Sequence, residues 1–397
     1  MTAAASNKTY AQKSLSLHAP PPHLPCDLVE EILCRLPVKQ LLQLCCVCKS
    51  WNSLISRDSK FAKNHLRFSI FSHDRYHLAQ CSVHSSEEFH LWKSPISSFI
   101  SSEAATAALT DSFTQQLNHP LIKRRYSYYD SVSTCDGILC FGINESLALL
   151  CNPSIRKFNI LLPPLNNSGS GLIYSQTWYT FVYDRFIHNY KIIALSLCSR
   201  HHDKYKKEVN VHTLGTDYWR KIIQDFPYHY SFPILSGIFV SDTVNWFVND
   251  TTCSGFSRVI VSFDLNKESY QELLQPLYEE SSLPTSKFLG ELRDCLCIFM
   301  NSYEFCDTWI MKEYGNEKSW TKLLRVPYIG GLDFSSYNKP LYIYEDNRVL
   351  MSFMKMGKFI LAVYDPKNNT FKTHQIQNNR HNWIVPIVYV ESLISPY

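Results

Sequence analysis

The sequence predicts an α+β multidomain protein, in which a small all-α unit precedes an all-β domain shaped as a β-propeller of about six blades. Apolar residues recur at helical spacing up to about residue 66, and short β-type runs take over from about residue 67. Those runs repeat with a period of 50 to 61 residues. We therefore expect a disordered N-terminal tail (1–22), a helical domain (23–66) and a propeller (67–397).

The helical pattern begins with Leu28, Ile32, Leu33 and Leu36, and Asp27 is the expected N-cap of this segment. The same spacing continues through Val38, Leu41, Leu42 and Cys45, then through Val47, Trp51, Leu54 and Ile55, and Asp58 begins a fourth helix that carries Phe61 and Leu66. A unit of about 40 residues rarely buries a sufficient core alone. We therefore expect something else to cover part of its apolar surface, and a partner protein is the natural candidate.

This stretch resembles an F-box of the plant type, through the pairs Leu24-Pro25 and Leu36-Pro37 and the VCKSW motif that ends at Trp51. The resemblance implies docking onto a Skp-family adaptor and, through it, onto a cullin. The implied adaptor-binding residues are Pro25, Leu28, Ile32, Leu33, Leu36, Pro37, Val38, Leu41 and Leu42. The implied core residues are Cys45, Val47, Trp51, Leu54 and Ile55. Gln43 and Leu44 stand where family members often have a basic residue followed by Phe.

The composition fits an intracellular protein of two parts. In 397 residues, 45% are hydrophobic and 14% aromatic, which is enough for a large core. The longest apolar run, 383–390, is too short to span a membrane. Fourteen cysteines without a secretory signal indicate free thiols in the cytoplasm, the nucleus or both. A formal charge of +4 without a concentrated basic face disfavours nucleic acid as a partner.

Two kinds of hairpin alternate along the rest of the chain. One kind ends in a strand that opens on an aromatic residue, at Phe158, Trp219, Tyr270, Trp320 and Phe371, which lie 50 to 61 residues apart. The other kind turns near Asp136, Asn189, Asp242, Asp294 and Asn347, which lie 52 or 53 residues apart. Together they predict one four-stranded sheet per period, and sheets of this kind bury both faces when they stack radially.

The hairpins add up to six blades, with seven as the alternative. The segment 68–83 is expected to supply one more hairpin at the start, and the run from Trp383 should close the ring against the first blade. Hairpins such as LAVYDPKNNTF and the closing YVESL are similar to the F-box-associated, kelch-like domain of plant F-box proteins, including relatives of the S-locus type. The two resemblances together cover nearly the whole chain.

No catalytic constellation, metal site or cofactor site is predicted. Cys45 and Cys48 have CxxC spacing, but they lie in a helical pattern with no second ligand pair, so we interpret them as small core residues. Asp136, Asp242, Asp294 and Asp346 recur at turns, where an aspartate accepts hydrogen bonds from nearby backbone amides. This repetition favours a structural role, because a catalytic acid is needed only once.

Propeller function usually resides in the loops at one rim of the channel. The longer loops here are 84–111, 165–177, 198–207 and 275–287. The third contains Arg200, Lys204, Lys206 and Lys207, which form a candidate substrate loop for an acidic or phosphorylated ligand. A solvated basic loop is the alternative.

The resemblance implies a non-catalytic substrate-recognition subunit of a Skp-cullin-F-box ubiquitin ligase, which brings an unidentified target protein to ubiquitination. Two alternatives stay open. The propeller could be a small-molecule sensor or an enzyme that uses the channel mouth, with the F-box controlling its turnover. The chain could also be an F-box protein that acts outside any ligase.

Overall fold

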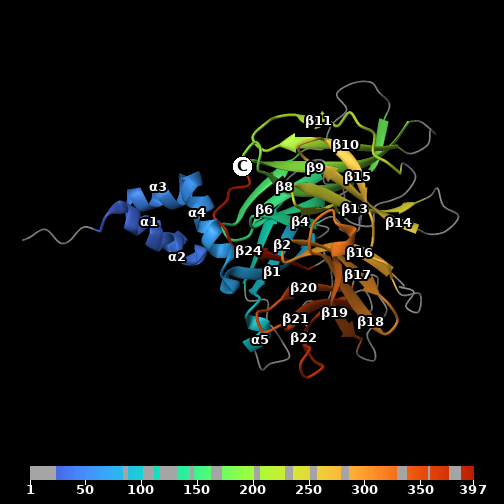
Figure 1. Ribbon diagram of the computed structural model, residues 1–397. Coiled ribbons are helices and arrows are strands. Elements are labelled where there is room, and N and C mark those ends of the chain that lie inside the picture. The colour runs from blue at the N-terminus through green and yellow to red at the C-terminus, as the bar shows by residue number, and fades with distance from the viewer. Residues whose placement is uncertain are drawn as a thin grey trace, which may run out of the picture.

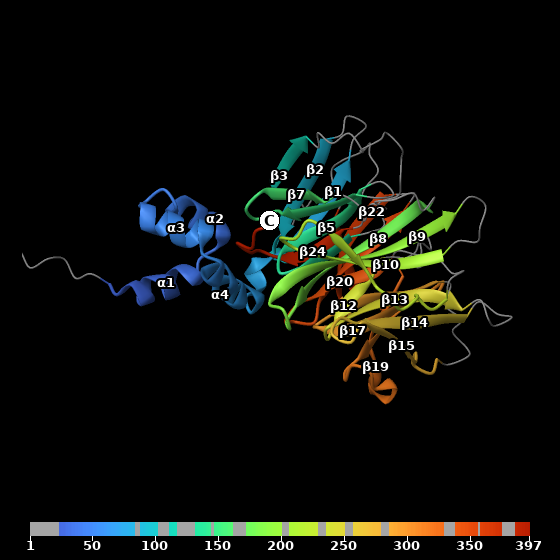
Figure 2. The same ribbon diagram turned by 90° about the horizontal axis from the view of Figure 1, so that it is seen from above.

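The computed structural model describes residues 24–83, 88–101, 111–116, 132–143, 147–161, 172–200, 206–228, 236–250, 257–278, 286–328, 338–355, 358–374 and 386–397. Four short helices lead into six four-stranded antiparallel sheets arranged around a ring, with the helices at one end of it (Figures 1 and 2). The predicted architecture of a helical unit followed by a six-bladed propeller is thus confirmed. The predicted disordered tail lies outside the described residues.

The helices follow the predicted apolar spacing. They are α1 (Cys26–Cys34), α2 (Val38–Leu44), α3 (Lys49–Arg57) and α4 (Ser59–Ile70). The Asp58 carboxylate accepts hydrogen bonds from the amides of Lys60 at 2.8 Å and Phe61 at 3.0 Å, so the predicted start of the fourth helix is confirmed. Asp27 is not an N-cap, because α1 begins one residue earlier, with Pro25 at the cap position and no side-chain cap.

The segment 68–83 does not form the predicted hairpin. Helix α4 runs on to Ile70, since Phe61, His65 and Ser69 continue its buried face at helical spacing. A 3₁₀ turn, η1 (His73–Arg75), then leads into the first strand. The helical unit therefore extends past residue 66.

The sheets are numbered here as blades 1 to 6. Blade 1 contains β24 (Ile387–Val390), β1 (Tyr76–Val83), β2 (Glu88–Pro95) and β3 (Asp111–Gln116), with α5 (Ser98–Ser101) after β2. Blade 2 contains β4 (Val132–Cys135), β5 (Ile138–Ile143), β6 (Leu147–Asn152) and β7 (Lys157–Leu161). Blade 3 contains β8 (Leu172–Asp184), β9 (Asn189–Arg200), β10 (Lys206–Thr213) and β11 (Trp219–Lys221).

The remaining three blades have the same order of strands. Blade 4 contains β12 (Ile238–Val240), β13 (Thr243–Asp250), β14 (Ser257–Asp264) and β15 (Ser269–Leu273). Blade 5 contains β16 (Ser286–Leu292), β17 (Cys295–Asn301), β18 (Phe305–Met311) and β19 (Trp320–Pro327), with η2 (Glu317–Ser319) before the last strand. Blade 6 contains β20 (Lys339–Ile343), β21 (Val349–Lys355), β22 (Lys358–Asp365) and β23 (Thr370–His374).

The ring closes as predicted. Strand β24 pairs antiparallel with β1, so that Val390 lies opposite Tyr76 and Ile387 opposite Ala79. The last strand of the chain thereby becomes the innermost strand of the first blade and gives blade 1 four strands, as in the other blades.

The two predicted hairpin types occupy fixed places in each blade. The repeated aromatics lie on the outer strands β7, β11, β15, β19 and β23, where they pack into the apolar clusters between sheets. Backbone φ is positive at Asp136, Asp242, Asp294 and Asn347, as turns there require, while His188 takes this role in place of Asn189.

Only one of the four predicted turn aspartates accepts from a local amide. Asp346 accepts from the Arg348 amide at 3.0 Å. Asp136 instead accepts from the Tyr190 hydroxyl at 2.8 Å, and Asp242 pairs with Arg185, both across a blade boundary. These carboxylates therefore join neighbouring blades, which the sequence pattern could not indicate.

Candidate functional site

Helix α1 carries apolar residues on two faces. Leu28 and Ile32 lie one turn apart on one face of α1 and Leu24 lies two residues before the helix, and 47%, 51% and 59% of their surfaces are exposed. We call these three residues the α1 stripe. Leu42 in α2 and Val47 after it are also exposed. Exposed leucines and isoleucines at helical spacing are typical of a surface that another protein covers.

The opposite face of the helical unit packs on the propeller. Leu33, Val38 and Leu41 are buried in one continuous apolar cluster that also contains Val390 and Leu393 from the end of the chain. Residues of the propeller therefore share in the cover that the sequence assigned to a partner protein, and the α1 stripe, Leu42 and Val47 stay exposed.

A polar joint beside this cluster fixes the helices to the ring. The Arg75 guanidinium pairs with the Glu391 carboxylate, and the same carboxylate accepts from the Val38 amide at 3.3 Å, at the start of α2. Arg75 also donates to the Arg35 carbonyl at 2.6 Å. The residue that follows the closing strand thus holds the α1–α2 connection in place.

Replacing Glu391 by alanine is expected to lower the free energy of unfolding by about 3 kcal/mol, because it leaves the buried Arg75 guanidinium without its carboxylate. Only 12% of the Arg75 side chain and 10% of the Glu391 side chain are exposed. The matched control is Glu345→Ala, whose side chain is 80% exposed where it pairs with His73. Urea unfolding of both variants tests this, and equal losses would contradict a specific joint.

The structure separates the predicted adaptor-binding residues into three groups. Pro25, Leu28, Ile32 and Leu42 are exposed, Leu36 and Pro37 are half-buried, and Leu33, Val38 and Leu41 are buried. The buried three cannot contact a partner in this arrangement, because they lie inside the apolar cluster that the helices share with the ring. The prediction that these three residues contact the adaptor directly is therefore corrected: they pack in the core beneath the exposed residues.

The predicted core residues divide similarly. Ile55 is buried, and Cys45, Trp51 and Leu54 are half-buried against the core cluster. Val47 is 62% exposed, so its assignment to the core is wrong. Cys48 is exposed as well and is not a core residue. All cysteines within the described residues are free, as expected.

The described residues of the candidate substrate loop belong to strands and do not form a basic loop. Lys206 and Lys207 belong to strand β10, and Lys206 forms a 2.8 Å ion pair with Asp225. Lys207 is buried, and its ammonium donates to the Tyr228 carbonyl at 2.9 Å. Arg200 ends strand β9, and Lys204 lies outside the described residues.

A narrow cavity of about 180 Å³ follows the axis of the ring, and the innermost strands of all six blades line it. Its charged lining residues are Glu291 and Lys339, which lie at opposite ends of strands β16 and β20. Phe181, Phe239 and Leu289 are among the apolar residues of its wall.

The surroundings of the channel shift the pKa values of both charged groups. Burial lowers the pKa of Lys339 to about 8. Burial also raises the pKa of Glu291, although its side chain remains accessible from the channel, and the Asp294 amide partly offsets this by donating to the carboxylate at 2.9 Å. Among the described residues, no carboxylate lies within ion-pair distance of Lys339.

Replacing Lys339 by methionine is expected to stabilise the protein at pH 7 by about 1 to 3 kcal/mol, since a charge of low pKa is removed from the channel. The folded pKa of about 8 lies below the usual 10.5, so the cost of the ammonium disappears as pH rises from 8 to 10.5. Urea unfolding of both proteins should show that the difference in their free energies of unfolding decreases as pH rises through this range. A constant difference, or the same gain from the exposed Lys267→Met, would contradict it.

Within the described residues, no group of three or more histidine, cysteine or acidic side chains is placed to hold a metal ion. No helix in that part of the chain is long and apolar enough to cross a membrane.

Comparison with known proteins gives the same division of the chain. A family model described as F-box domain matches residues 22–63, and one described as F-box associated beta propeller domain matches residues 71–396. An F-box/kelch-repeat protein of Arabidopsis thaliana is 31% identical over 95% of this chain and 96% of its own length. The F-box protein CPR1 of the same plant is 22% identical over 94% of this chain and 88% of its own.

A solved structure of similar fold shows a distant similarity. A GH43_1 enzyme from Xanthomonas citri complexed with xylotriose aligns with a TM-score of 0.37 at 8% identity, over 64% of this chain and 88% of that one. A similarity this low supports no statement about activity.

Proposed function

Since the chain belongs to the family of F-box proteins that carry an F-box-associated β-propeller domain, we propose that it is the substrate-recognition subunit of a Skp-cullin-F-box ubiquitin ligase. The α1 stripe is the observation that carries this proposal. It offers two exposed apolar side chains on one face of α1 and a third just before the helix, while other residues of the same helical unit lie in the apolar cluster shared with the ring. An apolar groove on a Skp-family adaptor is the partner that F-box membership implies for such a stripe.

The proposed role requires no catalytic group and no cofactor in this chain. The helices bind the adaptor, the propeller binds a target protein, and a separate enzyme transfers ubiquitin to the target's lysines. Tethering raises the effective concentration of those lysines near the enzyme, and this proximity is the whole contribution to rate. Such a ligase subunit would work in the cytoplasm, the nucleus or both.

The rigid joint supports this division of labour. Because Glu391 and Arg75 connect the ring-closing strand to the α1–α2 connection, a target held on the propeller has a defined position relative to the adaptor. The channel supports the sensor or enzyme alternative less well, because that alternative calls for charged groups that converge at the channel mouth. Glu291 and Lys339 lie at opposite ends of their strands.

Affinity purification of the full chain from cells, with the proteasome inhibited, tests the proposal. We expect a Skp-family adaptor, a cullin and at least one ubiquitinated protein to co-purify. Recovery of the adaptor without a cullin would favour an F-box protein that acts outside any ligase, and recovery of neither would defeat the proposal.

A further inference from the structure

Two cations from neighbouring blades lie together at the start of their strands. Arg258 is the second residue of β14 in blade 4, Lys287 is the second residue of β16 in blade 5, and the Arg258 guanidinium donates a hydrogen bond to the Lys287 carbonyl. The guanidinium carbon lies 5.7 Å from the centre of the Phe247 ring, and the Lys287 ammonium lies 3.8 Å from the centre of the Tyr278 ring. The two aromatic rings thus position both charges.

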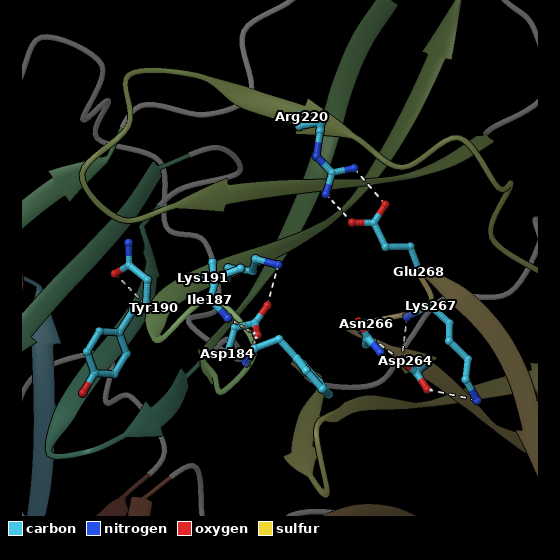
Figure 3. Close-up of polar contacts among 11 residues, drawn as sticks. Asp184, Ile187, Tyr190, Lys191, Arg220, Asp264, Asn266, Lys267 and Glu268 are labelled. Atoms are coloured by element: carbon cyan, nitrogen blue, oxygen red, sulfur yellow. Dashed lines mark hydrogen bonds and ion pairs between the residues drawn. The ribbon is translucent and has the colours of Figure 1, made fainter.

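Neither cation has a carboxylate partner among the described residues. Two cations of blade 3 do: Figure 3 shows Lys191 paired with Asp184, at 2.6 Å, and Arg220 paired with Glu268. Both Arg258 and Lys287 are half-buried. A half-buried charge without a counter-ion is unfavourable, and a second cation beside it adds repulsion.

The titration behaviour agrees with this environment. Burial lowers the pKa of the Arg258 guanidinium. Burial first, and then the charge of Arg258, lowers the pKa of Lys287 to about 8. An anion bound between them would relieve both effects.

The pair retains unused hydrogen-bond donors. A guanidinium has five N–H groups and an ammonium has three. Among the described residues, Arg258 uses its side chain for a single hydrogen bond, to the Lys287 carbonyl, and Lys287 makes none with its ammonium. A planar donor fork beside a compact cation suits an oxyanion, and two adjacent positive charges suit the dianionic phosphate ester better than a single carboxylate.

The site lies at the end of the propeller away from the helices. In Figures 1 and 2, β14 extends to the side opposite α1 to α4. Burial first, and then the charges of Asp294 and Glu291 at the other end of β16, raise the pKa of Tyr76, whose hydroxyl donates to the Ile70 carbonyl of α4 at 3.1 Å. A protein bound here would be clear of the adaptor surface.

We propose that Arg258 and Lys287 form an anion-binding site for a phosphorylated serine or threonine in the target protein. The identity of the ligand as a target rests on the proposed function above. This site replaces the candidate substrate loop at 198–207 as the place where an acidic group binds, since Lys206 already has Asp225 as its counter-ion.

Fluorescence anisotropy with labelled degenerate heptapeptides tests the site on the full chain bound to its adaptor. The central residue of the peptides is phosphoserine, glutamate or serine. We expect the phosphoserine library to bind most tightly, and Arg258→Gln or Lys287→Gln to weaken it at least tenfold. Lys206→Gln is the matched control, because it removes a cation from the neighbouring blade 3 that already has a partner, and it should change binding less than twofold.

Equal binding of the three libraries, or binding that neither variant weakens, would overturn the proposal. Inorganic phosphate that binds as tightly as the phosphopeptide would also overturn it, because the site would then hold a free ion only. Arg258→Lys preserves the charge and guards against a folding defect: it should retain more binding than Arg258→Gln. Co-purification of the adaptor is measured for the unaltered chain and for every variant. Absence of the adaptor from the unaltered chain would defeat the proposed function, whereas a change in peptide binding alone concerns only the anion-binding site.

Discussion

Replacing both Leu28 and Ile32 by aspartate is expected to reduce recovery of the adaptor with this protein by more than tenfold, without changing its thermal unfolding. Each aspartate would place a charge in an apolar interface, where loss of a central anchor typically costs about 2 kcal/mol or more. About half of each side chain is exposed in this chain, so the substitutions disturb little of its own core. Quantitative co-purification and a melting curve measure the two effects.

Leu277→Asp is the matched control for this double variant. Leu277 is an exposed leucine, at 97%, but it lies in the propeller after β15. It should leave adaptor recovery unchanged. Undiminished recovery with the double variant would contradict the assignment of the α1 stripe as the docking surface.

Removing residues 386–397 is expected to cause cooperative loss of the whole folded structure, seen as insolubility or the absence of a melting transition. The deletion takes away β24, which completes blade 1, and Leu393 and Ile394, which belong to the cluster between the helices and the ring. It also removes the acceptors of Asn152, whose amide donates to the Ser392 carbonyl at 3.1 Å and the Ile394 carbonyl at 2.8 Å. An open ring exposes sheet edges on both sides of the gap.

Removing Tyr397 alone is the control, because that residue is exposed and follows the last described contacts. This shorter deletion should melt like the full chain. A protein that lacks residues 386–397 and still melts like the full chain would show that ring closure contributes little to stability.

Periodicity predicted the architecture well because it is a local property of the chain. The spacing of Trp219, Tyr270 and Trp320 identified outer strands, because these blades pack an aromatic residue at the same place. The run after Trp383 identified the closing strand. The boundary near residue 67 was less accurate. Helix α4 continues to Ile70 because its buried face continues, and an apolar run such as Phe68 to Phe71 does not distinguish a helix end from a strand start.

The candidate site was harder to predict, because a helical pattern shows which residues are apolar but not what covers each face. Leu28 and Leu33 are equally apolar, yet Leu33 is buried in the apolar cluster shared by the helices and the ring, and Leu28 is exposed. That cluster includes Leu393 and Ile394, which are more than 350 residues away in sequence. The signal available in the sequence was the strict four-residue spacing of Leu24, Leu28 and Ile32.

The pattern of basic residues in the sequence did not indicate where an acidic ligand would bind, for a similar reason. The run from Arg200 to Lys207 stands out in the sequence, but Lys206 pairs with Asp225 and Lys207 donates to the Tyr228 carbonyl. Arg258 and Lys287 attract no attention in the sequence, because 29 positions separate them and each is a single basic residue in a strand. Only the packing of blade 4 against blade 5 brings them together.

The half-life of the captured target proteins, in cells that express either the unaltered chain or Leu28→Asp with Ile32→Asp, tests the receptor role most directly. Both full-length proteins keep the propeller and the joint at Glu391, so both should bind the same targets. If the chain delivers those targets to a ligase, the unaltered chain shortens their half-life and the double variant, which occupies them without delivering them, lengthens it. A double variant that accelerates target loss as much as the unaltered chain would contradict the account.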